Sequence, residues 1–255
     1  MNLEDIKEFS KQISKSLEFD KNLKQINWFN IGGKCKIFFK PNSLIELKNF
    51  LKLYNNRGKI FIIGAGSNVL FSDEDYDGVV IKLGKMFSNI TLKDENTIIS
   101  GSITTDKQLS EFAKNNGISG FEFLSCIPGS IGGGIRMNAG CFKNEFKDIL
   151  LSVQAIDLDG NIITIPASKI KFEYRKSDFS KDLIFLSATF RGKKGNVKLI
   201  EKETNEMKVK KNLAQPSKIK TSGSTFKNPV RQTKKKAWEL IKESVPLDTK
   251  FGGAS

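Results

Sequence analysis

Residues 127–140 read IPGSIGGGIRMNAG, and this glycine-rich segment decides how the rest of the chain is interpreted. Five of its fourteen residues are glycine, and Arg136 is its only charged residue. Glycine has no Cβ, so another molecule can approach its main chain closely. A mobile surface linker is the alternative, but linkers are usually rich in polar residues, whereas three isoleucines and a methionine interrupt these glycines. The segment therefore favours an ordered loop around a ligand, with backbone N–H groups suited to phosphate oxygens.

The composition is that of a soluble intracellular protein that cannot use histidine chemistry. The chain has 255 residues, enough for a large core, and three cysteines without CxxC spacing, which fits a reducing cytoplasm. No apolar run resembles a signal peptide or approaches the length of a membrane span. The lack of histidine excludes Ser-His-Asp and Cys-His catalysis and histidine metal ligands, so we expect no metal site.

The positive charge is concentrated in the last quarter of the chain. The net charge is +14, and residues 191–255 hold 17 Lys/Arg against 6 Asp/Glu. Such a region could bind nucleic acid, an acidic membrane surface or a phosphorylated small molecule, or it could simply be a solvated lysine-rich surface. No zinc-finger, homeodomain or RRM pattern is present, and this disfavours a nucleic-acid-binding module.

Helices and strands are mixed without regular βαβ alternation, so the pattern predicts an α+β protein of two or three subdomains. Helical signals include the capping pairs Ser43/Glu46 and Thr105/Gln108, and Asp159-Gly160 is a hairpin signal. We expect helices over residues 3–17, 44–54, 107–116, 197–212 and 235–243, and strands over residues 37–39, 60–63, 79–83, 97–100, 151–158, 161–165 and 183–191.

A second glycine loop, GAGSN at residues 64–68, directly follows the predicted strand over residues 60–63. Its N–H groups would point outward from the sheet edge, and its serine and asparagine add side-chain donors. Alone, this pentapeptide is only weak evidence for a phosphate-binding loop. Together with the glycine segment some sixty residues later it predicts a dinucleotide held from two sides.

Two further clusters are candidates for chemistry. The first is FEYRKSD at residues 172–178, where Arg175 is either a surface ion-pair partner or a functional cation. The second is TSGSTFKNP at residues 221–229, which is either an ordinary polar turn or a binding loop in the basic quarter.

Taken in order, these pieces resemble the UDP-N-acetylenolpyruvoylglucosamine reductases (MurB), flavoenzymes of bacterial peptidoglycan precursor synthesis. The likeness runs from about residue 27 to the last residue and is similar to the shorter of the family's two subtypes. The matching stretches are NWFNIGG (27–33), GAGSN (64–68), GFEFLSCIPGSIGGGIRMNAG (120–140), YRKS around Arg175, QPSKIKTSGSTFKNP (215–229) and KAWELI…GGAS (236–255).

The resemblance implies a two-subdomain FAD-binding α+β fold of the vanillyl-alcohol-oxidase (PCMH) type, followed by an α+β substrate domain. The implied divisions are an N-terminal helix (1–26), FAD-binding subdomains over 27–90 and 91–195, and the substrate domain over 196–255. The implied cofactor-binding residues are Gly64, Ala65, Gly66, Ser67, Asn68, Pro128, Gly129, Ser130, Gly132, Gly133, Gly134, Asn138, Ala139 and Gly140.

The resemblance also implies the reaction. NADPH reduces FAD and leaves, and UDP-N-acetylglucosamine enolpyruvate then accepts hydride from flavin N5 to give UDP-N-acetylmuramate. Arg175 would stabilise the enolate charge, and Ser224 would donate the proton to the carbon. Lys227, Asn228 and Gln215 would bind the substrate, a small UDP-sugar, in the cytoplasm, with no nucleic acid, membrane or required protein partner.

The family pattern continues past GGAS to a glutamate near the C-terminus that joins the arginine at the enolate, and no residue here matches it. We therefore expect an incomplete substrate domain, and FAD binding that survives better than turnover. The alternative to the reductase is a degenerate or different FAD-linked oxidoreductase of the same fold.

Overall fold

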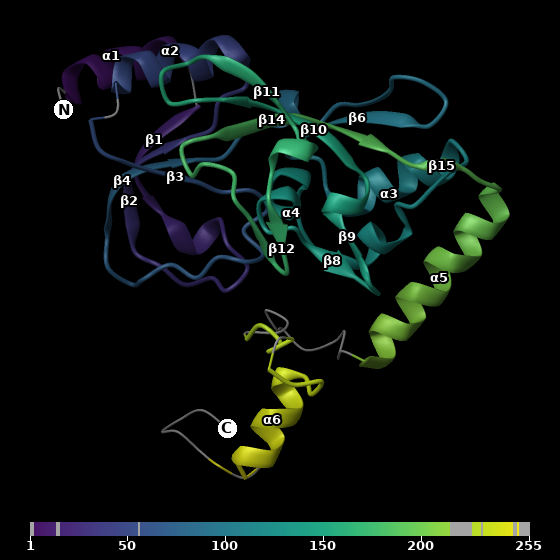
Figure 1. Ribbon diagram of the computed structural model, residues 1–255. Coiled ribbons are helices and arrows are strands. Elements are labelled where there is room, and N and C mark those ends of the chain that lie inside the picture. The colour runs from purple at the N-terminus through teal and green to yellow at the C-terminus, as the bar shows by residue number, and fades with distance from the viewer. Residues whose placement is uncertain are drawn as a thin grey trace. The chain divides into compact units, whose positions relative to one another are not determined.

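The computed structural model describes residues 3–13, 16–55, 57–214, 226–230, 232–246 and 249. The chain divides into two compact units, Met1–Lys218 and Ile219–Ser255. Figure 1 labels most of the helices and strands. The first unit contains every described strand and the three clusters of buried apolar residues that form its core.

The first sheet has four strands in the order β1-β2-β4-β3. Its strands are β1 (Leu17–Asn22), β2 (Lys34–Phe39), β3 (Lys59–Ile62) and β4 (Tyr76–Ile81). β1 runs antiparallel to β2, whereas β4 runs parallel to both β2 and β3. Helices α1 (Leu3–Gln12) and α2 (Leu44–Tyr54) lie side by side next to this sheet (Figure 1), and Phe39 of β2 stacks on Phe50 of α2 at 4.2 Å between ring centroids.

The N-terminal helix is shorter than the sequence predicts. The apolar spacing favoured a helix over residues 3–17, but α1 ends at Gln12 and Leu17 begins β1. Leu17 is buried and pairs with Phe39, so the edge of β2 gains backbone hydrogen bonds that a longer helix would not supply.

The second sheet has five strands in the order β11-β10-β14-β6-β5, and all of its pairs are antiparallel. The hairpin predicted around Asp159-Gly160 is confirmed as β10 (Leu150–Ile156) and β11 (Ile162–Pro166), and Gly160 has a φ of +87°. The remaining strands of this sheet are β5 (Ile90–Leu92), β6 (Thr97–Gly101) and β14 (Ile184–Arg191).

Helix α3 (Asp106–Asn115) lies after β6 and packs against the 3₁₀ turn η3 (Glu122–Cys126). Its capping box is confirmed, because Gln108 N donates to Thr105 Oγ1 at 3.2 Å and Thr105 N donates to Gln108 Oε1 at 3.0 Å. The Ser43 cap of α2 is also present, although the Glu46 carboxylate accepts from Asn42 N rather than from Ser43 N.

The glycine segment contains the short helix α4 (Ile131–Arg136). Three small ladders complete the unit: β8 (Gly140–Cys141) with β9 (Asn144–Glu145), β12 (Phe172–Glu173) with β13 (Lys176–Ser177), and β7 (Ile118–Ser119) with β15 (Lys193–Lys194). They are antiparallel pairs.

Helix α5 (Val197–Ala214) closes the described part of the first unit and packs against η3, α3 and β7. The helix predicted over residues 197–212 is present, with Ile200 and Thr204 buried on its inward face and Val197 exposed. The second unit contains α6 (Ala237–Ser244). Among the residues described in both units, no helix is long and apolar enough to cross a membrane, and no group of His, Cys, Asp and Glu is arranged for a metal ion.

Candidate active site

The two glycine loops, about sixty residues apart in the sequence, meet in the structure. A Cβ added at Gly64 would lie 2.4 Å from Ser130 Oγ, so the Ser130 side chain approaches the Gly64 main chain as closely as a glycine allows. Ser67 Oγ donates to Pro128 O at 2.7 Å and joins the GAGSN loop to the start of the glycine segment. The predicted dinucleotide loops therefore form one continuous surface.

The start of the glycine segment is fixed by an antiparallel contact with residues 102–106. Asp106 N donates to Gly129 O at 3.3 Å, and Gly132 N donates to Ser102 O at 2.7 Å. Between them, Ile131 N donates to Thr104 O at 2.9 Å. These bonds hold the backbone from Gly129 to Gly132 against the end of β6 and the first turn of α3.

The facing loops present N–H groups that have no acceptor within the described chain. Within the described residues, the N–H groups of residues 64–68, Gly129 and Ser130 donate to no backbone or side-chain acceptor. Gly66 has a φ of +75°, and a Cβ on it would lie 2.4 Å from Ile26 O. Only glycine suits this turn, and the N–H groups around it are available to the oxygens of a ligand.

Buried side-chain atoms that lack hydrogen-bond partners gather around the same two loops. Among the described residues there are five: Asn27 Oδ1, Ser102 Oγ, both carboxyl oxygens of Asp106, and Ser130 Oγ. Asn27 adjoins Gly66, because a Cβ there would lie 3.0 Å from Asn27 Cα. Buried polar groups are normally paired, so five unpaired atoms around one surface indicate that a polar ligand supplies their partners.

Gly133 adds bare main chain to this surface. It is exposed, and a Cβ built on it would meet only Ser130 Oγ, at 3.6 Å. The surface therefore satisfies the requirements of a large polar cofactor: free N–H donors, close main-chain approach and unpaired buried acceptors and hydroxyls.

The second half of the glycine segment, residues 134–140, packs within the protein instead. A Cβ on Gly134 would lie 2.3 Å from the buried ring of Phe146, and one on Gly140 would lie 2.3 Å from Asn144 O. Ala139 N donates to Gly134 O at 2.8 Å and turns the chain into β8. These glycines are needed for close packing.

Asn138 is fully buried and its amide is used by the protein. Its Nδ2 donates to Glu145 Oε2 at 2.9 Å and to Glu173 O at 3.1 Å, and its Oδ1 accepts from Lys147 N at 3.1 Å. With a φ of +41°, Asn138 occupies the left-handed region that asparagine tolerates better than most residues. Its observed contacts hold β9 and β12 in place.

Arg175 lies at the tip of the β12–β13 hairpin with a φ of +56°. One terminal nitrogen donates to Gly140 O at 2.7 Å and the other lies 3.6 Å from Glu145 Oε1, while the guanidinium sits 4.8 Å from the centre of the Tyr174 ring. The side chain is 31% exposed. The hairpin thus attaches a cation to the end of the glycine segment and leaves part of it open to a ligand.

Arg136, the only charge within the glycine segment, has a structural role. Its guanidinium donates to the carbonyls of Phe179, Ser180 and Leu183, and it lies 4.3 Å from the centre of the Phe185 ring. Burial lowers the pKa of Arg136 from its ordinary value.

Of the residues predicted to act on substrate, Ser224 and Gln215 lie outside the described residues. Within the second unit, Asn228 Oδ1 accepts from Ala237 N at 2.9 Å, at the start of α6. Lys227 precedes Asn228 in the sequence and is exposed.

Comparison with known proteins identifies the family. Residues 35–166 match the model of an FAD binding domain. The UDP-N-acetylenolpyruvoylglucosamine reductase of Pelagibacter ubique (strain HTCC1062) is 60% identical over 254 residues, which cover 100% of this chain and 84% of the relative. The Rickettsia typhi (strain ATCC VR-144 / Wilmington) enzyme of the same name is 44% identical over 92% of this chain and 79% of its own. The chain belongs to the UDP-N-acetylenolpyruvoylglucosamine reductase family.

Solved structures agree. The MurB crystal structure from Thermus caldophilus superposes with a TM-score of 0.76 at 29% identity, covering 89% of this chain and 79% of that one. The glucose dehydrogenase Phl p 4.0202 is only 11% identical, with a TM-score of 0.54 over 76% of this chain and 44% of its own, and shares the fold. The predicted PCMH-type FAD-binding α+β fold is confirmed, and this MurB-family chain is an FAD-dependent oxidoreductase.

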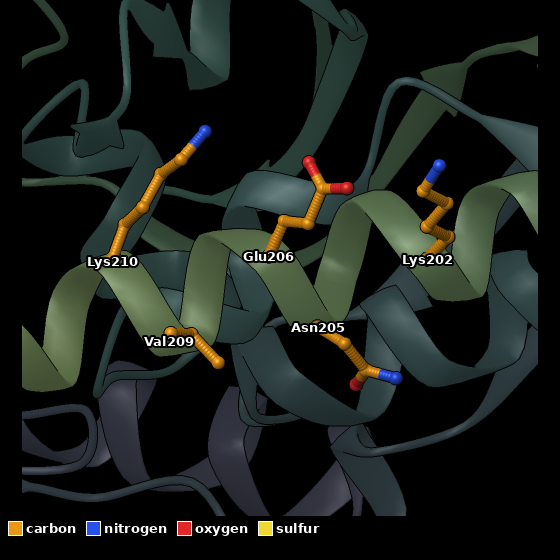
Figure 2. Close-up of a pocket in the computed structure, with 5 residues that line it drawn as sticks. All are labelled: Lys202, Asn205, Glu206, Val209 and Lys210. Carbon is orange, nitrogen blue, oxygen red and sulfur yellow. The ribbon is translucent and has the colours of Figure 1, made fainter.

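The sequence interpretation missed Asp106, Ser102 and Asn27 as candidates. For Asp106 a signal existed: it shares the spacing of the buried residues Leu109 and Ala113 on α3, so the helical period places its carboxyl on the inward face. A separate open hollow of about 420 Å³ lies along α5 and is lined by Lys202, Asn205, Glu206, Val209 and Lys210 (Figure 2). None of these residues belongs to the two glycine loops.

Proposed function

We propose that this chain catalyses the NADPH-dependent reduction of UDP-N-acetylglucosamine enolpyruvate to UDP-N-acetylmuramate, a cytoplasmic step of peptidoglycan precursor synthesis. The proposal rests on the names of its relatives and on one structural observation. That observation is the group of five unpaired buried polar atoms around the meeting point of the two glycine loops, which a bound FAD would complete. NADPH and UDP-sugars are cytoplasmic metabolites, which supports the location.

The residues that would hold FAD divide between direct contact and support. The GAGSN loop and the start of the glycine segment (Pro128, Gly129, Ser130, Gly132 and Gly133) would offer main-chain N–H groups and close approach. The predicted contacts of Gly134, Asn138, Ala139 and Gly140 are supported less well, because the observed bonds and packing of these residues are internal. Once NADPH has reduced it, bound FAD would supply the hydride that reduces the enolpyruvyl double bond.

Arg175 would stabilise the negative charge that spreads onto the substrate carboxylate as the double bond is reduced. Its guanidinium is held by Gly140 O and by the nearby Glu145 carboxylate, so its orientation is fixed before the substrate arrives. A preoriented cation loses little entropy on meeting the developing charge, and the partly exposed side chain remains reachable.

Ser224 would donate the proton to the carbanionic carbon. A serine hydroxyl is a weak acid, but a carbanion is a strong enough base to take its proton. Lys227, Asn228 and Gln215 would bind the UDP-sugar, since a cation and two amides suit a diphosphate and its sugar. These roles rest on the resemblance of QPSKIKTSGSTFKNP to the family pattern.

The experiment separates the two half-reactions. The FAD-loaded chain is mixed anaerobically with NADPH, and bleaching of the flavin absorbance is followed; UDP-N-acetylglucosamine enolpyruvate is then added and reoxidation is followed. We expect both phases, and a product that gains two hydrogens by mass, at least one of them as deuterium when the reaction is run in D₂O, because the N5–H of reduced flavin also exchanges with solvent. A flavin that NADPH bleaches but the enolpyruvyl sugar does not reoxidise would support a different FAD-linked oxidoreductase.

Two variants test the assigned roles. Ser224→Ala and Arg175→Lys should each slow reoxidation by about 10²-fold or more. Both should leave the bleaching by NADPH and the FAD affinity near those of the parent chain. If bleaching and reoxidation slow equally, the variants have disturbed the fold or the cofactor site, and the roles given to these two residues are wrong.

A further inference from the structure

Asp106 carries the one carboxyl group among the unpaired buried atoms of the described chain. It is the first residue of α3 and is 0% exposed, and neither carboxyl oxygen has a hydrogen-bond partner. The N–H groups of Thr105 and Gln108 do not serve it, because Thr105 Oγ1 accepts from Gln108 N and Gln108 Oε1 accepts from Thr105 N. A buried carboxyl in this situation is costly, so its retention requires an explanation.

The position of Asp106 ties it to the cofactor surface. Its main-chain N donates to Gly129 O at 3.3 Å, and its Oδ2 would lie 2.8 Å from a Cβ built on Gly129. The same Cβ would lie 3.9 Å from Ser67 Oγ, so the carboxyl, the bare Cα of Gly129 and the GAGSN loop converge. A side chain at position 129 would fill the space that the carboxyl faces.

The surroundings of Asp106 hold the carboxyl in its neutral form. Burial alone raises the pKa of Asp106 from 3.8 to about 8. The elements described around it bring no charge: residues 102–105, residues 64–68 and residues 127–133 contain no ionisable side chain. On α3 itself the nearest charged side chains, Lys107 and Glu111, are exposed. A neutral carboxyl is a hydrogen-bond donor, whereas a carboxylate beside a diphosphate would repel it.

We propose that Asp106 is a cofactor-positioning residue whose protonated carboxyl donates a hydrogen bond to an oxygen of bound FAD beside Gly129. This inference rests on the proposed placement of FAD against the two glycine loops. It adds a residue from outside both motifs, and it makes FAD binding proton-linked: affinity falls as the carboxyl ionises.

The test measures FAD binding to the FAD-free full chain by flavin fluorescence between about pH 6.5 and about pH 9.5, a range that spans ionisation of the carboxyl. In the parent chain we expect the dissociation constant to rise at least about fivefold over this range. Asp106→Asn keeps a neutral donor, so it should bind within about threefold of the parent at neutral pH and lose the pH dependence. Asp106→Ala should bind about tenfold more weakly or worse at neutral pH, also without the pH dependence.

Ser110→Ala is the matched control, because Ser110 is a buried polar residue one turn further along the same helix. It should show the affinity and pH dependence of the parent chain. The melting temperature of the FAD-free protein provides a readout independent of the cofactor. Asp106→Asn should raise this melting temperature at alkaline pH, because the variant no longer buries an ionisable carboxyl. If the carboxyl instead had a purely structural role, the substitution should lower the melting temperature.

The outcomes separate this inference from the proposed function. If the parent chain binds FAD and the Asp106→Ala variant binds it with the same affinity, only the role of Asp106 is overturned. An affinity for the parent that does not change with pH would overturn its protonated state as donor. A parent chain that binds no FAD at any pH would overturn both this inference and the proposed function.

Discussion

Two adjacent glycines of the glycine segment should respond in opposite ways to the same substitution. Gly133 is exposed, and an added methyl would meet only Ser130 Oγ at 3.6 Å, which is ordinary contact. Gly134 is buried, and its added methyl would lie 2.3 Å and 2.4 Å from two ring carbons of Phe146. Both residues lie in α4, so alanine improves the backbone propensity equally at the two positions.

The magnitudes follow from these distances. In Gly133→Ala the methyl costs little, and the gain in helix propensity should stabilise the FAD-free protein by about 0.5–1 kcal/mol. In Gly134→Ala the ring of Phe146 must move, yet it is fixed by Phe123 and Phe190 at centroid distances of 6.3 Å and 6.1 Å. Overpacking of such a core costs about 1–3 kcal/mol or more, which exceeds the propensity gain.

The assay is urea unfolding of the FAD-free chains, followed by FAD titration of each. Gly133→Ala should unfold at the same or higher urea concentration, yet bind FAD about tenfold more weakly or worse, because the methyl occupies main-chain surface proposed to face the cofactor. Gly134→Ala should unfold earlier. Parental FAD affinity in a stable Gly133→Ala protein would refute the assignment of this backbone face to the cofactor, and parental stability of Gly134→Ala would refute the packing argument.

Three further substitutions test the supporting structure. Arg136→Met removes three carbonyl bonds and should lower the unfolding free energy by about 2–4 kcal/mol in urea, while the chain still binds FAD at low urea. Asn138→Ala removes an amide that makes three recorded bonds and should lower the thermal midpoint by several degrees, with FAD affinity changed less than stability. For Asp106 the folded pKa lies above the ordinary value, so its stabilising contribution is complete below about pH 4 and is lost as pH rises towards 8. Each pH unit above 3.8 costs up to about 1.4 kcal/mol, which amounts to about 4 kcal/mol at pH 7, and Asp106→Asn should remove this decline from unfolding curves measured across that range.

Much of the fold could be predicted because its signals are local. The Thr105/Gln108 capping box begins α3 where the pattern places it, and the Asp159-Gly160 turn lies between β10 and β11. Both signals act through hydrogen bonds or backbone angles within a few residues, so no tertiary information is needed. The end of α1 could not be predicted in this way, because the partner that draws Leu17 into a strand is Phe39, far along the chain.

The function of each glycine was not readable from the sequence. Residues 129–134 contain four glycines that the sequence alone does not distinguish. In the structure, a Cβ added at each of them would contact different atoms. At Gly129 it is a carboxyl oxygen, at Gly132 the Ser102 side chain and carbonyl, at Gly133 almost nothing, and at Gly134 an aromatic ring. These neighbours come from other segments of the chain, so only the fold distinguishes a glycine that faces a ligand from one that packs a core.

The unpaired atoms carry the same argument one step further. Asn27, Ser102, Asp106 and Ser130 span about a hundred residues of sequence, belong to no common motif, and are ordinary polar residues when taken singly. Folding buries them around two glycine loops without giving these atoms partners, although a serine, an asparagine or a carboxyl in a core normally finds one. A glycine motif shows where a ligand can approach; unmet hydrogen-bonding capacity shows that the folded chain is incomplete without it. On that reasoning the affinity for FAD should depend on these scattered polar residues as strongly as on the glycines, which makes Asp106 the most informative position to change.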